Sequence, residues 1–416
     1  MSVDPAAANL NQQDEAHLRR ALMLAERGLY TTDPNPRVGC VIADAQGIVG
    51  EGWHVRAGEP HAEVLALRAA GNRARGADVY VTLEPCSHTG RTPPCADALI
   101  AAGVARVWCC TADPNPKVAG SGIERLRAAG IEVNLGAFGA QARALNPGFF
   151  SRFERHRPYV RLKMAMSLDA RTAPGGPAPA SPTPASATPS RPGAAGSGQV
   201  WISGEASRAD VQTWRARSSA VLTGSGTVLC DDPKLNVRLN YGPWVRQPLR
   251  VVLDTELRCR PGAQIFQDGG ALTFAASDAP GSGALNVERV ARAAGGLDLD
   301  AVIARLAALE INELLLECGA RLAGAFLAKG LVDEMVLYVA PGLMGQDAAP
   351  LAYFGGGAPW GGAPRDGTPC SGATRDGARR DAAHGAVAPA LSRPFEFSDV
   401  RRVGDDVRLL LTSREN

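Results

Sequence analysis

The first 157 residues alternate between helical and strand-like hydrophobic patterns. Apolar residues recur at helical intervals from Asp14 to Gly28, which predicts an amphipathic helix in which His17 is exposed or capping. Later apolar runs rich in valine have the composition of strands, and helical stretches lie between them. Alternating strands and helices are typical of a layered α/β domain, which we expect to end near Arg157. The expected strands cover residues 38–44, 48–54, 79–83, 106–111 and 131–134.

The pattern from residue 158 to residue 416 predicts a second α/β domain. A strand begins at Pro158, and helices are expected at residues 206–217 and 299–309. The strand-like run E-L-L-L-E is followed by a glycine turn, from Cys318 to Ala325, and a helix. Such a turn can cradle a phosphate or a dinucleotide because a helix amino terminus attracts anions, although similar connections are common. Further strands, the last two forming an edge hairpin, are expected at residues 220–228, 250–255, 271–274, 313–317, 335–341, 395–400 and 406–412.

Two segments interrupt this alternation. Residues 174–198 are rich in Pro, Ala, Ser and Gly, and roughly residues 355–390 are rich in Gly, Ala, Pro and Arg. Such compositions bury too little apolar surface to offset the conformational entropy that is lost on ordering. We therefore expect low-complexity insertions, the first disordered and the second a surface loop.

Composition narrows the class of protein. Hydrophobic residues make up 45% of the chain and charged residues 21%, so two or three domains can bury cores. The formal net charge of +2 gives no broad basic field, so nucleic acid is not an expected partner. Nine cysteines, including the adjacent Cys109 and Cys110, do not suggest a disulfide framework. We find neither a signal-peptide pattern nor a membrane-length apolar run, and we expect a soluble protein of the reducing cytoplasm.

Four residues of the first domain have the types and spacing of a catalytic zinc site. His61 stands in G-E-P-H-A-E-V, and Cys86 and Cys95 stand in T-L-E-P-C-S-H-T-G-R-T-P-P-C. One imidazole and two thiolates are three ligands, and because zinc prefers four, one position remains for water. Glu63 would take a proton from that water and pass it to a leaving group.

The expected elements support this geometry. The pattern places His61 and Glu63 in a first helical turn, Cys86 after a strand and Cys95 at a helix amino terminus, which stabilises a thiolate. Any one of these residues alone would be interpreted as a buried structural cysteine or a surface histidine. H-x-E followed by P-C and a second cysteine, however, is typical of zinc-dependent nucleobase deaminases. Their usual spacing is P-C-x-x-C, whereas here eight residues separate the two cysteines.

The longer loop resembles one branch of these enzymes, the bifunctional riboflavin-biosynthesis deaminase-reductase family. P-N-P-R-V-G-C (34–40), G-E-G-W-H (50–54) and D-P-N-P-K-V-A-G-S-G (113–122) resemble the same family. In the second half S-L-D-A-R resembles the family's S-L-D-G-R, with Ala170 in place of glycine. The resemblance implies an N-terminal cytidine-deaminase-like three-layer domain over residues 1–157 and a C-terminal dihydrofolate-reductase-like α/β domain over residues 158–416.

The resemblance also implies the chemistry. A zinc-bound water would attack the amino-bearing carbon of a phosphoribosylated diaminopyrimidinone, ammonia would leave, and NADPH would reduce the ribosyl side chain to ribityl. The pattern of the second half alone shows no catalytic constellation, because hydride transfer needs mainly orientation and electrostatics from the protein. Each half carries its own site, so we expect the two activities to separate near Arg157.

The resemblance also implies individual site residues, each at a position that matches the family's sequence. Asn35, equally suited to a turn, would contact the deaminase substrate. His88 as a fourth ligand would close the zinc site to water, so we expect it instead to face the substrate or to support the zinc ligands from outside. Gln199 stands where the family has a substrate-facing serine and is left out. In the reductase, Arg215 and Arg238 could bind a phosphate through their planar guanidinium groups, with surface charge as the alternative. The implied substrate residues are Lys163, Arg215, Leu235, Arg238 and Glu317, and the implied cofactor residues are Ala165, Trp201, Thr227, Asp231, Thr255, Gly319, Ala320, Arg321, Leu322, Ala323, Gly324 and Ala325.

Two other functions stay open. A nucleic-acid or free-nucleobase zinc deaminase with an appended binding domain would need a basic, aromatic channel, and only 5% of the residues are aromatic. A zinc-dependent structural module is disfavoured by three ligands next to a glutamate. We expect Zn²⁺ and NADPH as cofactors, a small-molecule substrate, no membrane partner, and self-association into a homo-oligomer.

Overall fold

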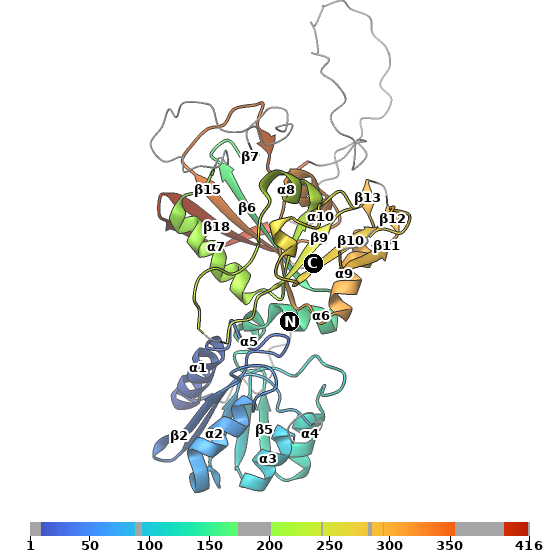
Figure 1. The fold of residues 1–416 in the computed structure, drawn as a ribbon. Coiled ribbons are helices and arrows are strands. Elements are labelled where there is room, and N and C mark those ends of the chain that lie inside the picture. The colour runs from blue at the N-terminus through green and yellow to red at the C-terminus, as the bar shows by residue number, and fades with distance from the viewer. Residues whose placement is uncertain are drawn as a thin grey trace, which may run out of the picture.

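The structure is a computed structural model that describes residues 10–87, 94–173, 201–242, 244–281, 285–293, 295–353 and 395–414. The expected insertions at residues 174–198 and 355–390 lie outside these ranges. One large sheet organises each half of the chain (Figure 1). Within the described ranges, no helix is both long and apolar enough to cross a membrane.

The amino-terminal sheet has the strand order β2-β1-β3-β4-β5. β1 is antiparallel to its neighbours, and β3, β4 and β5 are parallel. Helices α1 and α5 pack on one face, and α2, α3 and α4 pack on the other, which gives the expected three layers. The elements are β1 (Gly39–Asp44), β2 (Gly47–Trp53), β3 (Asp78–Val81), β4 (Arg106–Cys109), β5 (Glu132–Leu135), α1 (Gln12–Glu26), α2 (Ala62–Ala70), α3 (Cys95–Ala102), α4 (Ser121–Ala128), α5 (Gly139–Leu145) and α6 (Pro147–Glu154).

Two glycines of the G-E-G-W-H motif allow α2 to approach β2 closely. A Cβ atom at Gly50 would lie 2.2 Å from the carbonyl oxygen of Ala66, and one at Gly52 would lie 2.3 Å from that of Ala62. The two glycines stand two positions apart, so they share one face of the strand. The close approach fixes the first turn of α2, at which His61 is the N-cap.

The environment of His17 differs from the expectation. Its side chain is buried, at 7% exposure, and its ring lies 4.8 Å from the ring of Tyr80. The prediction of an exposed or capping histidine was wrong, because His17 shares the buried face of α1 with Asp14 and Ala21. Burial lowers the pKa of the ring.

The carboxyl-terminal sheet has the strand order β11-β10-β9-β8-β14-β6-β15-β18-β17. The strands from β11 to β15 are parallel, and β18 and β17 form the expected antiparallel hairpin at one edge. Helices α7 and α8 pack on one face, and α9 and α10 pack on the other. The elements are β6 (Tyr159–Ser167), β7 (Arg171–Ala173), β8 (Ala220–Gly224), β9 (Leu249–Leu253), β10 (Ala271–Ala276), β11 (Val287–Val290), β12 (Arg292–Ala293), β13 (Gly296–Leu297), β14 (Glu313–Glu317), β15 (Glu334–Ala340), β16 (Ala349–Pro350), β17 (Phe395–Val403), β18 (Asp406–Ser413), α7 (Glu205–Arg217), α8 (Ser225–Asp231), α9 (Leu299–Ala308) and α10 (Ala320–Ala328). The predicted α/β class is confirmed in both halves.

Two connections in this half differ from the sequence pattern. The strand expected at residues 220–228 ends at Gly224, and α8 begins at Ser225. The glycine turn expected from Cys318 to Ala325 is mostly helix, because α10 begins at Ala320 with Gly319 as its N-cap. Both sequences therefore form a strand, an extended glycine and a helix.

Helices α5 and α6 lie between the two sheets (Figure 1). α6 ends at Glu154 and β6 begins at Tyr159, so a short connection links the two halves. The helix approaches the second half closely, because a Cβ atom at Gly148 would lie 2.5 Å from the backbone of Asn312.

Candidate active sites

Three candidate zinc ligands come together at two helix amino termini. The ligand atoms of His61, Cys86 and Cys95 all lie within 4.8 Å of one another. His61 Nδ1 is 3.6 Å from the sulfur of Cys86 and 3.3 Å from the sulfur of Cys95. His61 caps α2, and Cys95 is the first residue of α3 and donates its backbone N–H to the sulfur of Cys86 at 3.3 Å.

The electrostatics of the two sulfurs favour a bound cation. A hydrogen bond from Cys95, helped by His61, lowers the pKa of Cys86 to about 4. The neighbouring Cys86 sulfur and burial raise the pKa of Cys95. Two thiolates so close together, that of Cys95 buried and that of Cys86 partly buried, repel each other, and a divalent cation between them removes that repulsion. One imidazole and two thiolates therefore fit Zn²⁺ and leave one coordination position for another ligand.

Glu63 lies in the first turn of α2, two residues after the candidate ligand His61. Its side chain is buried, and burial raises its pKa to about 7. A carboxyl group with a pKa near neutrality can both accept and return a proton at neutral pH. The geometry therefore suits the predicted role of Glu63.

The reductase half gathers its candidate residues at one edge of the sheet. β9, β8, β14 and β6 are adjacent and parallel, so their carboxyl ends meet there. Ligands of open α/β sheets bind in crevices outside these ends. Ala165 and Lys163 lie towards the end of β6, Glu317 ends β14, and Thr255 follows β9. Thr227 and Asp231 lie in α8, which begins directly after β8.

Three of the predicted substrate residues contact or neighbour one another. Arg215 forms a bidentate ion pair with Glu317, with Nε–Oε1 at 2.6 Å and Nη2–Oε2 at 3.0 Å. Arg215 also donates to the carbonyl oxygen of Asn236 at 3.1 Å. Lys163 is the register partner of Glu317 on β6, and burial lowers the pKa of this lysine. The carboxyl ends of these strands therefore carry fixed charges of both signs.

Leu235 and Arg238 lie in the segment after α8, and the structure places them differently. Leu235 is buried and packs in a core cluster with Val211 and Trp214. Arg238 is exposed, and its backbone N–H donates to Gln212 Oε1 at 2.9 Å. Among the described residues, no ion pair or hydrogen bond engages the Arg238 guanidinium group. Arg238 is therefore better placed than Arg215 to bind a phosphate.

The amino terminus of α10 fits an anionic cofactor group. Gly319 is exposed, no side chain caps the helix, and its first turn contains no acidic residue. The first N–H groups of a helix lack intrahelical partners and attract a phosphate. Ala323 and Gly324 point elsewhere, because Ala323 is buried in the core and a Cβ atom at Gly324 would lie 1.9 Å from the carbonyl oxygen of Tyr353. Fewer residues can therefore contact the cofactor here than the sequence predicted. The predicted residues are Gly319, Ala320, Arg321, Leu322, Ala323, Gly324 and Ala325.

Comparison with known proteins identifies both halves. A family model described as the cytidine and deoxycytidylate deaminase zinc-binding region matches residues 11–111, and the RibD C-terminal domain matches residues 158–359. The riboflavin biosynthesis protein RibD of Escherichia coli (strain K12) is 47% identical over 352 residues, which cover 82% of this chain and 90% of that protein. RibD of Haemophilus influenzae is 42% identical over 353 residues, or 82% and 89% of the two chains. The chain belongs to the RibD family.

Solved RibD structures share the arrangement of the whole chain. Acinetobacter baumannii RibD (form 1) has a TM-score of 0.77 at 39% identity, with 97% of this chain and 99% of that chain covered. A Thermotoga maritima protein, named as a diaminohydroxyphosphoribosylaminopyrimidine deaminase/5-amino-6-(5-phosphoribosylamino)uracil reductase, has a TM-score of 0.73 at 28% identity and the same coverage. This RibD-family chain is therefore a bifunctional riboflavin-biosynthesis enzyme with a zinc-binding deaminase domain and a reductase domain.

One residue of the RibD deaminase site was not selected from the sequence. His54 closes the G-E-G-W-H motif, and its Nδ1 donates to the carbonyl oxygen of Pro60 at 3.2 Å, because that oxygen can only accept. Its Nε2 therefore accepts from Asn35 Nδ2 at 3.0 Å. Burial lowers the pKa of His54 to about 4, so the ring is neutral at neutral pH. His54 thus fixes the side chain of Asn35, and its ring lies 5.2 Å from that of His61.

A second residue that sequence reasoning missed is Glu84, in the E-P-C run before Cys86. Its buried carboxylate accepts four backbone N–H bonds, from residues 113, 120, 122 and 123, at 2.9 to 3.3 Å. Glu84 thereby ties the D-P-N-P segment to the loop that carries Cys86. The position of Glu84 between an expected strand and P-C marks it as close to the zinc site, but its four backbone partners follow only from the fold.

The predicted contacts of two further site residues are not tested by the described structure. His88 lies in residues 88–93, outside the described ranges, so its substrate contact stays a prediction. Trp201 is 57% exposed, and the guanidinium carbon of Arg208 lies 5.0 Å from its ring centroid. The cofactor contact of Trp201 likewise stays a prediction.

Proposed function

We propose that the zinc site of this enzyme deaminates a phosphoribosylated diaminopyrimidinone and that the second crevice reduces the ribosyl group of the product with NADPH. The observation that carries the proposal is the convergence of three zinc-type ligands on a buried glutamate, Glu63. The Thermotoga maritima relative is named for these two activities. This chain shares the arrangement of both domains with that protein.

In the deamination, His61, Cys86 and Cys95 would hold Zn²⁺, which lowers the pKa of water and so supplies a nucleophile. Glu63 accepts the proton of this water and returns it to the departing amino group, so that a C–O bond forms, a C–N bond breaks and ammonia leaves. Asn35, held by the neutral His54, hydrogen bonds to the pyrimidine ring. We also propose that His88 contacts the substrate.

In the reduction, the residues at the carboxyl ends of the parallel strands bind and orient the reactants. The amino terminus of α10 at Gly319 and the neighbouring Ala165, Thr227 and Thr255 would hold NADPH, a hydride donor to C1′ of the ring-opened ribosylamine, an imine carbon that keeps its bond to nitrogen. Arg238 binds the substrate phosphate, and Lys163 lies beside the sugar with Glu317 as its charged neighbour. Asp231 and Trp201 complete the proposed cofactor contacts.

A direct assay tests this proposal. Zinc-loaded protein is supplied with the phosphoribosylated diaminopyrimidinone, and ammonia release and NADPH oxidation are measured separately. We expect ammonia without NADPH, and NADPH oxidation only after deamination. Ammonia release from cytidine or single-stranded DNA, but not from this substrate, would instead support a nucleobase or nucleic-acid deaminase.

The remaining proposals concern the setting of the enzyme. The chemistry of two thiolate ligands supports a reducing compartment, the cytoplasm, because oxidised cysteines do not bind zinc. We further propose a homo-oligomer, for which analytical ultracentrifugation is the test. A sedimentation coefficient of a single 43.3 kDa chain at all concentrations would contradict it.

A further inference from the structure

The segment from Asp33 to Arg37 connects the two domains through alternate residues. Its central residue, Asn35, bonds to His54 in the deaminase site. Its first residue bonds to the reductase domain, where Asp33 Oδ1 accepts from Ser219 Oγ at 2.8 Å and from Asn312 Nδ2 at 3.0 Å. Asn312 Nδ2 also donates to the carbonyl oxygen of Pro34 at 2.8 Å. The other domain therefore holds Asp33 and Pro34, while the Asn35 backbone N–H donates within its own domain to the carbonyl oxygen of Thr32 at 2.9 Å.

The last residue of the segment also contacts the reductase domain. Arg37 is buried and pairs with Glu313 at 2.6 Å, and Glu313 in addition accepts from Arg161 at 2.8 Å and Arg217 at 3.1 Å. Burial alone would raise the pKa of Glu313, but the three arginines hold it below its usual value. The Arg37 backbone is also fixed within its own domain, because Asn146 exchanges two hydrogen bonds with it. The Asp33 end thus depends more on the reductase domain than the Arg37 end does.

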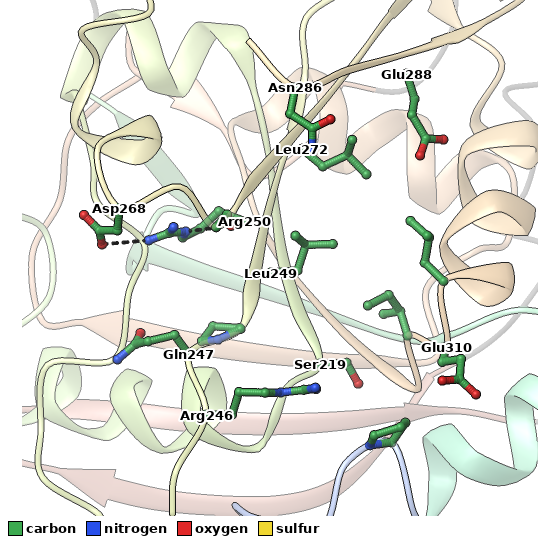
Figure 2. A pocket seen from close by; sticks show the side chains of 15 residues that line it. Ser219, Arg246, Gln247, Leu249, Arg250, Asp268, Leu272, Asn286, Glu288 and Glu310 are labelled. Atoms are coloured by element: carbon green, nitrogen blue, oxygen red, sulfur yellow. Dashed lines mark hydrogen bonds and ion pairs between the residues drawn. The ribbon is translucent and has the colours of Figure 1, made fainter.

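Polar contacts hold Asp33 next to a cavity. A cavity of about 540 Å³ opens beside this contact and is lined by Pro34, Ser219 and Arg246 (Figure 2). Arg246, 57% exposed at the side chain, also pairs with Asp33. Three polar side chains of the reductase domain therefore hold Asp33: Ser219, Asn312 and Arg246.

We propose that Asn312 and Ser219 of the reductase domain are positioning residues for deamination: by holding Asp33 and Pro34, they set the place of Asn35 beside the zinc site. The inference rests on the proposed contact of Asn35 with the deaminase substrate. It makes the reductase domain part of the deaminase site. The reductase domain would then assist the first reaction as well as carry out the second, so a deaminase half separated near Arg157 would be active but weaker.

The position of these residues separates the proposed role from reduction. Asn312 immediately precedes β14, whereas the candidate reductase residue Glu317 ends it. Five residues of an extended strand span about 16 Å, at about 3.3 Å per residue. A change at Asn312 should therefore leave the carboxyl edge of the sheet, and with it the reduction, undisturbed.

The test uses full-length Asn312→Ala with zinc bound. We expect about a tenfold lower kcat/KM for deamination, mainly through KM, because two hydrogen bonds to the segment are lost. Zinc content and turnover of the supplied deaminated substrate with NADPH should stay within about twofold of the unaltered protein. Asp33→Ala should cause a similar loss, and the loss in the double variant should be clearly smaller than the sum of the two single losses, because both variants remove the hydrogen bond between Asn312 and Asp33.

A matched control removes another contact between the domains. Glu310→Gln weakens the pair of Glu310 with Arg152 at 3.4 Å, which does not touch the segment, and should leave deamination unchanged. If Asn312→Ala melts at a much lower temperature, Ser219→Ala takes its place with the same expected result. Asn35→Ala distinguishes the two ways to fail. Full deamination by Asn35→Ala overturns the proposed role of Asn35 and this inference with it, whereas a loss in Asn35→Ala without a loss in Asn312→Ala overturns this inference alone.

Discussion

The two candidate sites of this enzyme differ in how visible they are in the sequence. The deaminase site consists of atoms that the chemistry requires: three metal-binding atoms and a buried carboxylate. The three metal-binding atoms lie within 4.8 Å of one another. The reductase crevice is formed where four parallel strands end, and its residues are ordinary ones such as Lys163 and Arg238. Metal chemistry restricts residue types, whereas hydride transfer mainly requires a shaped and charged surface. The first site can therefore be derived from a motif, and the second needs the fold.

The largest effect should come from a ligand of the metal. Cys95→Ala removes one of three ligands, and we expect zinc affinity to fall by more than about 100-fold, since even outer partners of zinc ligands contribute 10- to 100-fold. Deamination should fall to background, while reduction of the supplied intermediate continues. Metal analysis and the two separate assays check this. The control is Cys230→Ala, which removes an exposed thiol of the second half; bound zinc in Cys95→Ala equal to that in this control would contradict the ligand assignment.

Glu63→Gln should separate the two activities without loss of the metal, because it keeps the zinc ligands and removes only the proton carrier of the deaminase site. We expect kcat for deamination to fall by about 100- to 10,000-fold, the range for general acid-base groups. Zinc content and reduction should not change. Glu59→Gln, a carboxylate two residues before His61 that pairs with Arg56, is the matched control. Substantial ammonia release by Glu63→Gln would remove this residue from the mechanism.

More of the deaminase site than of the reductase site could be predicted from the sequence, for physical reasons. The H-x-E and P-C patterns place His61 and Cys95 at helix starts, where the structure also has them. The roles of His54 and Glu84 could not be derived, because they depend on partners that only folding brings near, such as Asn35. Likewise, nothing in the sequence shows that Ala323 faces the core or that Arg215 is engaged by Glu317. The α/β class was predictable because hydrophobic spacing is local, whereas the neighbours of a strand are not.

In the reductase crevice the contrast between Arg238 and Arg215 can be tested. Arg238→Ala should raise the KM for the deaminated substrate about tenfold, because a charge-assisted hydrogen bond to the phosphate is lost. The melting temperature should not change. Arg215→Ala should instead destabilise the fold by about 3 kcal/mol, because it removes the bidentate ion-pair partner of the Glu317 carboxylate. Kinetics and thermal unfolding distinguish the two. Arg402→Ala, at an arginine whose side chain is 77% exposed, is the control; an equal effect of this change on KM would show that the crevice does not depend on Arg238.

The smallest effect is expected from shortening residues 174–198 to a few glycines, a change that tests whether the reductase crevice is complete without them. Their Pro, Ala, Ser and Gly composition predicts little buried apolar surface, and the cost of closing a loop grows only slowly with its length. We therefore expect deamination, reduction and the melting temperature to change by no more than the experimental error. Gln199 to Ser203 stay in place, because the candidate cofactor residue Trp201 lies among them. If the shortened protein lost NADPH oxidation alone, residues 174–198 would belong to the crevice. The second site would then include residues that neither a motif nor the strand ends reveal.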